Sequence, residues 1–271
     1  MHLVSFNIFR TLGLPNTQIL KPEQFLQHKE LLQQADWVLF PEYWQLNALV
    51  HGLKCRVFPS ISSYRIGHDK IEMTRAFQTV AALHTPWTLI LANGPEEREQ
   101  VWQTMSLPFV AKHPKASMGE GVWLIESAED WRRYYESADV LYVQEYLPID
   151  RDIRVVVVGD QVVSAYWRHQ APQGFYNNVA RGGWVGADQV PDSATALALQ
   201  VARDLDVNHA GFDIAMVGDY PYLLEFNRLF GNQGLAGKRV QETMLHYLGA
   251  QLEPKDPDEP VSPVPLWRIA G

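Results

Sequence analysis

Residues 211–227 read GFDIAMVGDYPYLLEFN, and this stretch decides how we interpret the chain. Two apolar runs flank a Gly/Asp/Pro cluster, a pattern typical of a β-hairpin. Because side chains alternate along a strand, Glu225 and Asn227 share one face of the predicted sheet, while Leu224 and Phe226 share the other. The hairpin therefore presents a polar face and an apolar face.

Asp213 is the third polar residue of this hairpin. If the loop spans residues 218–222, Asp213 lies opposite Asn227 and joins the polar face, whereas a slip of one residue would turn it away. Two carboxylates and an amide oxygen are hard ligands, which suit Mg²⁺ completed by waters and substrate phosphates. The alternative interpretation is a solvated polar face of a sheet.

The composition is that of an ordinary globular protein. The 271 residues suit one large domain or two to three small lobes, with 46% hydrophobic and 20% charged residues. The net charge of −8 argues against nucleic acid as a partner but leaves room for a phosphate ligand, which needs only a few local lysines. The single cysteine, Cys55, excludes an internal disulfide and suits a reducing compartment.

The start of the chain does not read as a secretory signal, because no positively charged segment precedes its apolar residues. No window approaches the roughly 18 apolar residues of a membrane span. We therefore expect a soluble, cytoplasmic protein with no membrane partner.

The first part of the chain predicts alternating strands and helices. We expect strands over residues 3–8, 37–40 and 56–58, and helices over 22–35 and 43–53. This order implies a small parallel sheet covered by helices. No Gly-rich phosphate fingerprint follows the first strand, so this region shows no sign of binding a dinucleotide.

The rest of the chain predicts α+β structure. We expect helices over 70–83, 96–102, 129–135, 193–205 and 240–248, and strands over 87–92, 108–112, 122–125 and 140–144. Residues 153–158 and 161–167 form a second hairpin around Gly159-Asp160, and Ser193 is a plausible N-cap. The Pro-rich acidic tail over 254–265 reads as an extended or disordered appendage.

Lys112 and the small-residue loop over 115–121 are the second candidate site. A lysine at a strand end, followed by such a loop, can place an ammonium and backbone N–H groups around phosphate oxygens. The order of a P-loop is absent, so a surface turn is the alternative. The segment Gln144-Glu145-Tyr146-Leu147 could offer backbone groups to a flat base.

Asp152 and Arg154 alternate onto one strand face. Arg154, together with Arg181 further along the chain, could stabilise a transferred phosphoryl group or an oxyanion. The alternative is a surface ion pair, worth only ~0–1 kcal/mol.

The order of these motifs resembles the ATP-grasp superfamily, and within it the RimK-like branch of carboxylate–amine ligases. The resemblance covers Asp69-Lys70 and nearly everything from 108 to 237. Three segments are similar to the family wording, namely Val143-Gln144-Glu145-Tyr146, Asp152-Ile153-Arg154-Val155 and Arg181-Gly182-Gly183.

The resemblance implies an α+β ATP-grasp fold, in which two α+β lobes clasp ATP after a small α/β parallel-sheet domain. It implies a small N-terminal domain over 1–68, the smaller ATP-grasp lobe over 69–147 and the C-terminal lobe over 148–253. The Pro-rich tail then occupies 254–271.

The resemblance also implies a role for each candidate residue. The expected nucleotide-binding residues are Lys70 and Lys112 at the phosphates, Ser117, Gly119 and Gly121 in the closing loop, Glu145 and Tyr146 at the adenine, Asp152 at the ribose, and Asn177 and Asn178. The expected ligands of Mg²⁺ or Mn²⁺ are Asp213, Glu225 and Asn227, and Arg154 and Arg181 would hold the acyl-phosphate.

The implied reaction begins when a substrate carboxylate attacks the γ-phosphate of ATP. An amine then displaces phosphate from the acyl-phosphate, giving an amide. The expected partners are a small carboxylate and amine of an amino acid or peptide, or a protein terminus, and the short first domain could support a homodimer. The alternatives are a phosphotransferase on the same fold and a non-catalytic nucleotide-binding protein.

Two departures from the family pattern concern the substrate. After Asn227 the family continues with a small residue and Pro-Gly, whereas this chain has Arg228-Leu229-Phe230. Tyr176 stands where the family often has an arginine. These differences put the identity of the substrate in doubt more than nucleotide binding.

Overall fold

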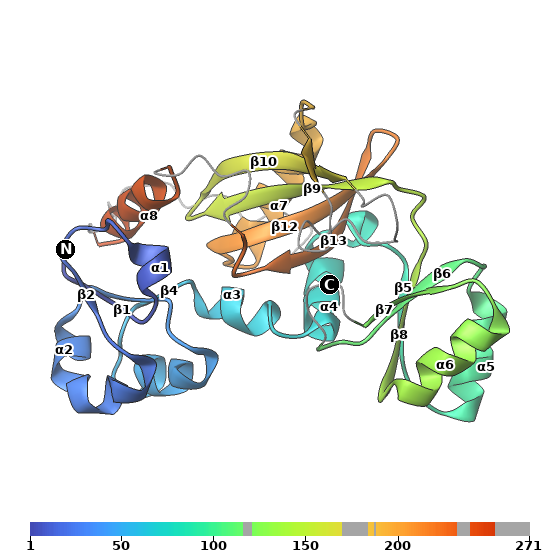
Figure 1. Cartoon of the computed structure of the whole chain (residues 1–271), viewed down its shortest axis with the longest axis horizontal. Coiled ribbons are helices and arrows are strands. Elements are labelled where there is room, and N and C mark those ends of the chain that lie inside the picture. Colours follow the sequence, from blue (N-terminus) through green and yellow to red (C-terminus); the bar gives the residue numbers. More distant parts are fainter. Residues whose placement is uncertain (116–120, 170–183, 187, 232–238, 253–271) are drawn as a thin grey trace, which may run out of the picture.

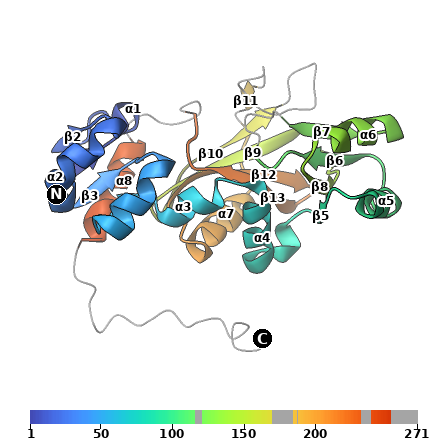
Figure 2. The same ribbon diagram turned by 90° about the horizontal axis from the view of Figure 1, so that it is seen from below.

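The computed structural model describes residues 1–115, 121–169, 184–186, 188–231 and 239–252. Its strands form three sheets, of four, five and four strands. The five-stranded sheet lies between the N-terminal sheet and the sheet of the small lobe (Figures 1 and 2). Among the described residues, no helix combines the length and the apolar character that a membrane span needs.

The N-terminal sheet is entirely parallel, as the β-α-β-α-β order predicts. Its strand order is β2-β1-β3-β4, with β1 at Leu3–Ser5, β2 at Thr17–Ile19, β3 at Trp37–Leu39 and β4 at Val57–Phe58. The short helical segments around it are α1 (Ile8–Thr11), η1 (Pro22–His28), α2 (Lys29–Gln34), η2 (Tyr43–Gln45) and η3 (Ala48–Gly52). Cys55 is a buried thiol of this domain.

The small lobe is an antiparallel sheet with its own core. The strand order is β5-β8-β6-β7, with β5 at Thr88–Ala92, β6 at Phe109–Lys112, β7 at Val122–Ile125 and β8 at Val140–Glu145. Two helices, α5 (Pro95–Thr104) and α6 (Ala128–Ser137), pack against it. Among the described residues, its buried cluster, which includes Phe109 and Trp131, is formed by residues of this lobe.

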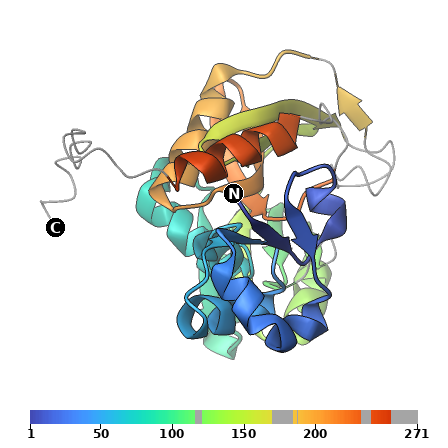
Figure 3. The same ribbon diagram turned by 90° about the vertical axis from the view of Figure 1, so that its left-hand side faces the viewer.

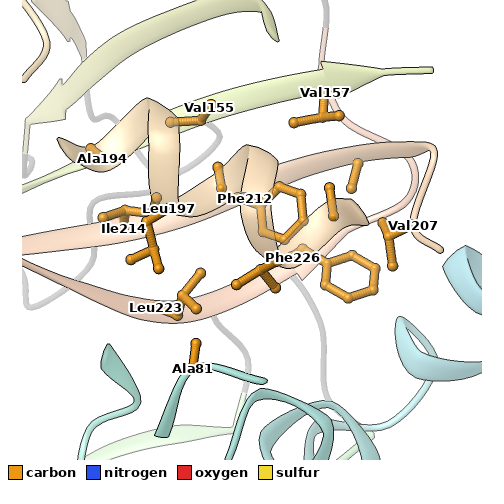
Figure 4. Close-up of a cluster of buried hydrophobic side chains, with 14 of the residues drawn as sticks. Ala81, Val155, Val157, Ala194, Leu197, Val207, Phe212, Ile214, Leu223 and Phe226 are labelled. Atoms are coloured by element: carbon orange, nitrogen blue, oxygen red, sulfur yellow. The ribbon is translucent and has the colours of Figure 1, made fainter. Parts of the chain in front are cut away.

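The central sheet is antiparallel, in the order β11-β10-β9-β12-β13. The strands are β9 (Arg151–Val158), β10 (Gln161–His169), β11 (Trp184–Gly186), β12 (His209–Val217) and β13 (Tyr220–Asn227). Helices α4 (Lys70–Val80) and α7 (Asp192–Asp204) cover one face, where Leu197 of α7 packs with Phe212 and Phe226 (Figure 4). The connecting helix α3 (Ile61–Ile66) leads from the N-terminal domain into α4.

Helix α7 begins one residue earlier than the sequence suggests. Its first residue is Asp192, and Pro191 occupies the N-cap position without a side-chain hydrogen bond. The prediction that Ser193 caps this helix is therefore wrong, because Ser193 already lies in the first turn.

Part of the opposite face of the central sheet is also covered. Helix α8 (Arg239–Ala250) and the N-terminal sheet share a core with Val156, Val158 and Tyr166 (Figure 3). The indole Nε1 of Trp37 donates to the carbonyl of Leu248 at 3.2 Å. The same face carries the charged residues of the candidate site where this cover ends.

The register of β12 and β13 differs from the prediction. Val217 pairs with Tyr220, so the loop is only Gly218-Asp219, and a bulge further along leaves Leu224 without a partner. Asp213 consequently lies opposite Glu225 rather than Asn227. The predicted pairing is wrong, but all three polar residues still share a face because the bulge restores the alternation.

The same bulge determines which of two adjacent leucines lies in the core. Leu223 is 1% exposed and belongs to the core with Phe226, whereas Leu224 is half-buried at the bulge. The prediction that Leu224 shares the apolar face is therefore wrong, since the extra residue displaces it from the core.

Candidate active site

Four buried charges form a network on the face of the central sheet opposite α4 and α7, and we term them the charge quartet: Asp152, Arg154, Arg168 and Asp213. Arg154 donates to both carboxylate oxygens of Asp213, at 2.6 and 3.2 Å. Arg168 does the same for Asp152, at 2.7 Å for both bonds, and its Nη2 lies 3.0 Å from Asp213 Oδ2. Arg168 thus joins two carboxylates that the sequence assigned to different roles.

The charges of the quartet determine its protonation. Burial opposes ionisation of Asp213, but Arg154 and Arg168 outweigh it and lower the pKa of this carboxyl. Burial raises the pKa of Asp152 to about 6 despite its bond to Arg168. Burial alone would lower the pKa of Arg168, yet Asp213 and Asp152 raise it. The two carboxyls therefore differ, because the arginines keep Asp213 ionised whereas Asp152 takes up a proton more readily on acidification.

Glu225 and Asn227 extend this face onto β13. Asn227 Nδ2 donates to Glu225 Oε1 at 3.3 Å, and Lys70 Nζ lies 3.6 Å from Glu225 Oε2. Lys70 is the first residue of α4, whose N-cap Asp69 accepts from the backbone N–H of Ile71 at 2.7 Å. That cap determines where the helix begins and so places Lys70 beside β13.

Lys112 reaches this cluster from the small lobe. Its buried Nζ donates to Gln144 Oε1 at 2.7 Å, and Gln144 Nε2 donates to Thr88 Oγ1 at 2.9 Å. Burial lowers the pKa of Lys112 to about 8, while Glu225 raises it and Lys70 lowers it. These mutual effects mean that charged groups of the small lobe, α4 and the central sheet lie within electrostatic range of one another.

A hydrogen bond also joins the small lobe to α4. The hydroxyl groups of Tyr142 on β8 and Thr74 on α4 lie 2.6 Å apart, and Lys112 Nζ lies 5.8 Å from the Tyr142 ring centroid. Tyr142 therefore supports the small-lobe lysine and contacts the helix that carries Lys70.

The oxygen atoms around Asp213 fit a hard divalent cation. Asp213 and Glu225 are directly opposed on neighbouring strands, and Asn227 shares their face. The three bonds from Arg154 and Arg168 leave Asp213 with about one of its roughly four acceptor positions. Within the described ranges no group of three or more His, Cys, Asp and Glu side chains forms a metal site. The candidate set instead combines two carboxylates with an amide.

The other predicted residues divide into two groups. Gly121 adopts a positive φ of 73°, and its carbonyl accepts from His113 N at 2.7 Å. Glu145 Oε1 accepts from Trp87 N at 2.7 Å, so this side chain contacts the neighbouring strand edge. Tyr146 follows directly after β8. Five predicted residues lie outside the described residues, namely Ser117, Gly119, Asn177, Asn178 and Arg181.

Sequence reasoning missed Arg168 and Gln144 as residues that position others. An arginine within an apolar strand could have signalled a buried ion pair, since a buried charge needs a partner. The partner of Arg168 depends on a bulge at Val163, without which Arg168 would oppose Arg151. Gln144 lies in the segment 144–147, for which the sequence suggests a role of the backbone alone.

Comparison with known proteins places this geometry in a family. Residues 69–247 match the model of the RimK-like ATP-grasp domain. A protein named probable alpha-L-glutamate ligase from Klebsiella pneumoniae (strain 342) is 27% identical over 218 residues, which cover 74% of this chain and 72% of that protein.

Two solved structures share the fold. The RimK domain protein ATP-grasp from Sphaerobacter thermophilus DSM 20745 aligns with a TM-score of 0.67 and 16% identity, over 91% of this chain and 99% of that one. The D-alanine–D-alanine ligase from Bacillus anthracis aligns with a TM-score of 0.67 and 14% identity, over 93% and 99% of the two chains. The predicted α+β ATP-grasp fold is thereby confirmed.

Proposed function

The chain belongs to the RimK-like ATP-grasp domain family, and we infer on this basis that it is an ATP-dependent ligase that joins a carboxylate to an amine. The observation that carries the assignment of the site is the ion pair of Lys70 with Glu225, with Lys112 of the small lobe within electrostatic range of both. The two lysines can bind the phosphates of a nucleoside triphosphate, and the carboxylates opposite them can bind the metal ion that accompanies it.

In this proposal Lys112 and Lys70 bind the phosphates of ATP. Gln144 holds the ammonium of Lys112 in place, so that its position is set before the nucleotide arrives. The backbone at Glu145 and Tyr146 lies along the adenine, and Asp152 lies near the ribose while retaining its bond to Arg168. Asn177, Asn178 and the loop residues Ser117, Gly119 and Gly121 stay predictions for the same nucleotide.

Asp213, Glu225 and Asn227 would hold Mg²⁺, with Mn²⁺ as a substitute. Bound there, the ion would neutralise charge on the transferring phosphoryl group. Arg154 and Arg168 keep Asp213 ionised and correctly oriented for this role.

The proposed reaction has two steps. A carboxylate oxygen attacks the γ-phosphorus and the bond to the β,γ-bridging oxygen breaks. The products of this step are ADP and an acyl-phosphate, which stays bound to the protein. The amine then attacks the acyl carbon, loses a proton and expels inorganic phosphate. Arg154, with Arg181 as a predicted partner, would stabilise the charge on the acyl-phosphate and its tetrahedral successor.

Relatives named alpha-L-glutamate ligases support an acidic amino acid as one of the two substrates. We propose that L-glutamate, free or within a peptide, enters the reaction. A protein terminus is the other class of substrate that this chemistry accommodates.

The test is release of ADP and phosphate with pairs of amino acids and peptides, followed by mass spectrometry of the product. We expect an amide and about a 100-fold or larger loss of turnover in Glu225→Gln and Lys112→Met. Glu136→Gln is the matched control, because Glu136 forms an exposed ion pair on α6. Retained turnover in both site variants would refute the site, and a stable phosphorylated product would instead indicate a phosphotransferase.

A further inference from the structure

Two arginines that are far apart in the sequence each lie against an aromatic ring. Arg10 of α1 donates through Nη2 to the carbonyl of Phe230 at 2.6 Å and lies 5.6 Å from its ring centroid. The guanidinium of Arg228 lies 4.2 Å from the ring centroid of Tyr64, a residue of α3. We term Arg10, Arg228 and the two rings that they contact, those of Phe230 and Tyr64, the arginine shelf.

His209 holds the shelf together. Its ring stacks on Phe230 at 4.7 Å, and its Nδ1 lies 2.7 Å from the carbonyl of Arg228. Burial lowers the pKa of His209 to about 3, and the charges of Arg10 and Arg228 act in the same direction. The histidine is therefore neutral, and its Nδ1–H donates to the backbone carbonyl of Arg228. The positive charges of the shelf are those of Arg10 and Arg228.

Neither guanidinium of the shelf has a carboxylate partner among the described residues. The ion pairs found there include Arg154 and Arg168 but neither Arg10 nor Arg228. Glu42 and Arg228 both act on Tyr64, but no ion pair joins them in the described part of the chain, and the Glu42 carboxylate accepts from the backbone at the start of η2. Both shelf arginines are half-buried, and a half-buried cation that forms no ion pair with the described residues is suited to bind an anion from outside.

The shelf lies next to the reacting centre of the proposed ligase. His209, Gly211 and Asp213 alternate onto the same face of β12. A Cβ on Gly211 would come within 2.8 Å of Arg154 Cδ and 3.1 Å of Phe230 Cβ. Arg154 and Phe230 therefore both lie against Gly211, which places Arg154 of the quartet next to the Phe230 side of the shelf.

We propose that the arginine shelf binds a second anionic group of the substrate, the side-chain carboxylate of an acidic amino acid or of an acidic residue in a peptide. The group bound here is distinct from the carboxylate that reacts and from the triphosphate. This proposal rests on the proposed ligase function and adds the residues that select the substrate. Arg228 stands where the family pattern predicts a small residue, so the selection belongs to this chain's own sequence.

The test compares acids with their isosteric amides. Binding of L-glutamate and L-aspartate is measured against L-glutamine and L-asparagine, by calorimetry in the presence of Mg²⁺ and a non-hydrolysable ATP analogue. We expect the wild-type protein to prefer each acid by about tenfold or more. Arg10→Met and Arg228→Met should each remove most of that preference and leave binding of the analogue unchanged, whereas Arg228→Lys should retain part of it.

Arg132→Met is the control, because Arg132 forms an exposed pair on α6. Equal binding of acids and amides by the wild-type protein would overturn the proposal, as would an undiminished preference in both methionine variants. Release of ADP is measured separately. A shelf-dependent preference for acids over amides without ADP release would support the shelf and refute the ligase function. ADP release without that preference would support the ligase function and refute the shelf.

Discussion

In the proposed nucleotide site, the buried residue Lys112 would couple nucleotide binding to pH. Its Nζ has Gln144 as a neutral partner, and burial lowers its pKa from 10.5 to about 8. Between these two pH values the unfolded chain holds a proton that the folded protein lacks, so folding stability from this group rises with pH. A bound phosphate would raise the pKa of Lys112 again, because it favours the charged ammonium over the neutral amine.

We therefore expect the protein to take up a proton when it binds Mg-ATP at pH 8. The affinity should fall as pH rises above 8, since the neutral amine must first be protonated. Titration calorimetry of an ATP analogue in two buffers of different ionisation enthalpy measures the uptake. Lys112→Arg should bind without this uptake because a guanidinium stays charged, and the same uptake in that variant would contradict the assignment.

Arg168 provides a second test at this scale. Replacing it in Arg168→Met leaves Asp152 and Asp213 buried with only Arg154, so we expect a loss of about 3–5 kcal/mol in the free energy of unfolding. The loss should shrink below pH 6, where Asp152 takes up a proton. Urea denaturation measures both effects. Arg133→Met, which breaks an exposed pair, should cost at most about 1 kcal/mol, and similar losses in the two variants would argue against the quartet.

At the level of elements, two bulges align the residues of the site. One at Leu224 keeps Glu225 and Asn227 on the face of Asp213, although the two-residue loop would otherwise turn them toward the core. The other, at Val163, brings Arg168 opposite Asp152. Each bulge adds one residue to one strand and so reverses the alternation beyond it.

The bulge in β13 predicts a difference between adjacent leucines. Leu223→Ala should lower the free energy of unfolding by about 2–5 kcal/mol, because Leu223 is 1% exposed in the core. Leu224→Ala should cost under about 1 kcal/mol, since Leu224 lies at the bulge. Denaturant unfolding of the two variants compares them directly. A larger loss in Leu224→Ala would contradict this register.

Sequence alone could predict the elements better than their pairing. The apolar runs and turn residues correctly predict both central hairpins, and the order of motifs predicts the family. Strand β2 escaped notice because Thr17–Ile19 is largely exposed and has no apolar alternation. The ion pairs of Arg168 also escaped, because they depend on a bulge that changes pairing without any turn residue to mark it. The roles of the individual site residues stay predictions.

At the level of the whole molecule, one buried cluster crosses a predicted domain boundary and another lies within a single lobe. The N-terminal sheet shares a core with the central sheet and α8, through residues such as Trp37 and Val156. The small lobe has a core of its own and is connected through neighbouring residues, since Glu145 N donates to Trp87 O at 2.9 Å.

We expect two truncations to behave differently. Removing residues 1–68 exposes the apolar face around Val156 and Val158, each worth about 1.5–3 kcal/mol when buried, so the remainder should bind a hydrophobic dye and melt at lower temperature. Replacing residues 88–144 by a short Gly-Ser linker between Trp87 and Glu145 should leave cooperative unfolding intact. Thermal melts followed by circular dichroism test both, and the reverse ranking would contradict this division.

The burial of the quartet has a consequence for the protein in concentrated salt. Mobile ions screen charges over a Debye length of about 8 Å at physiological ionic strength, but only where solvent reaches them. The side chains of Arg154, Arg168, Asp152 and Asp213 are 7–10% exposed, whereas Arg132 and Glu136 on α6 are 57% and 56% exposed. Added salt therefore weakens the pairs on α6 and competes for the anion-binding arginines, while the quartet keeps its geometry. Weaker substrate binding at high salt would then indicate that salt anions compete for the shelf arginines while the quartet stays intact.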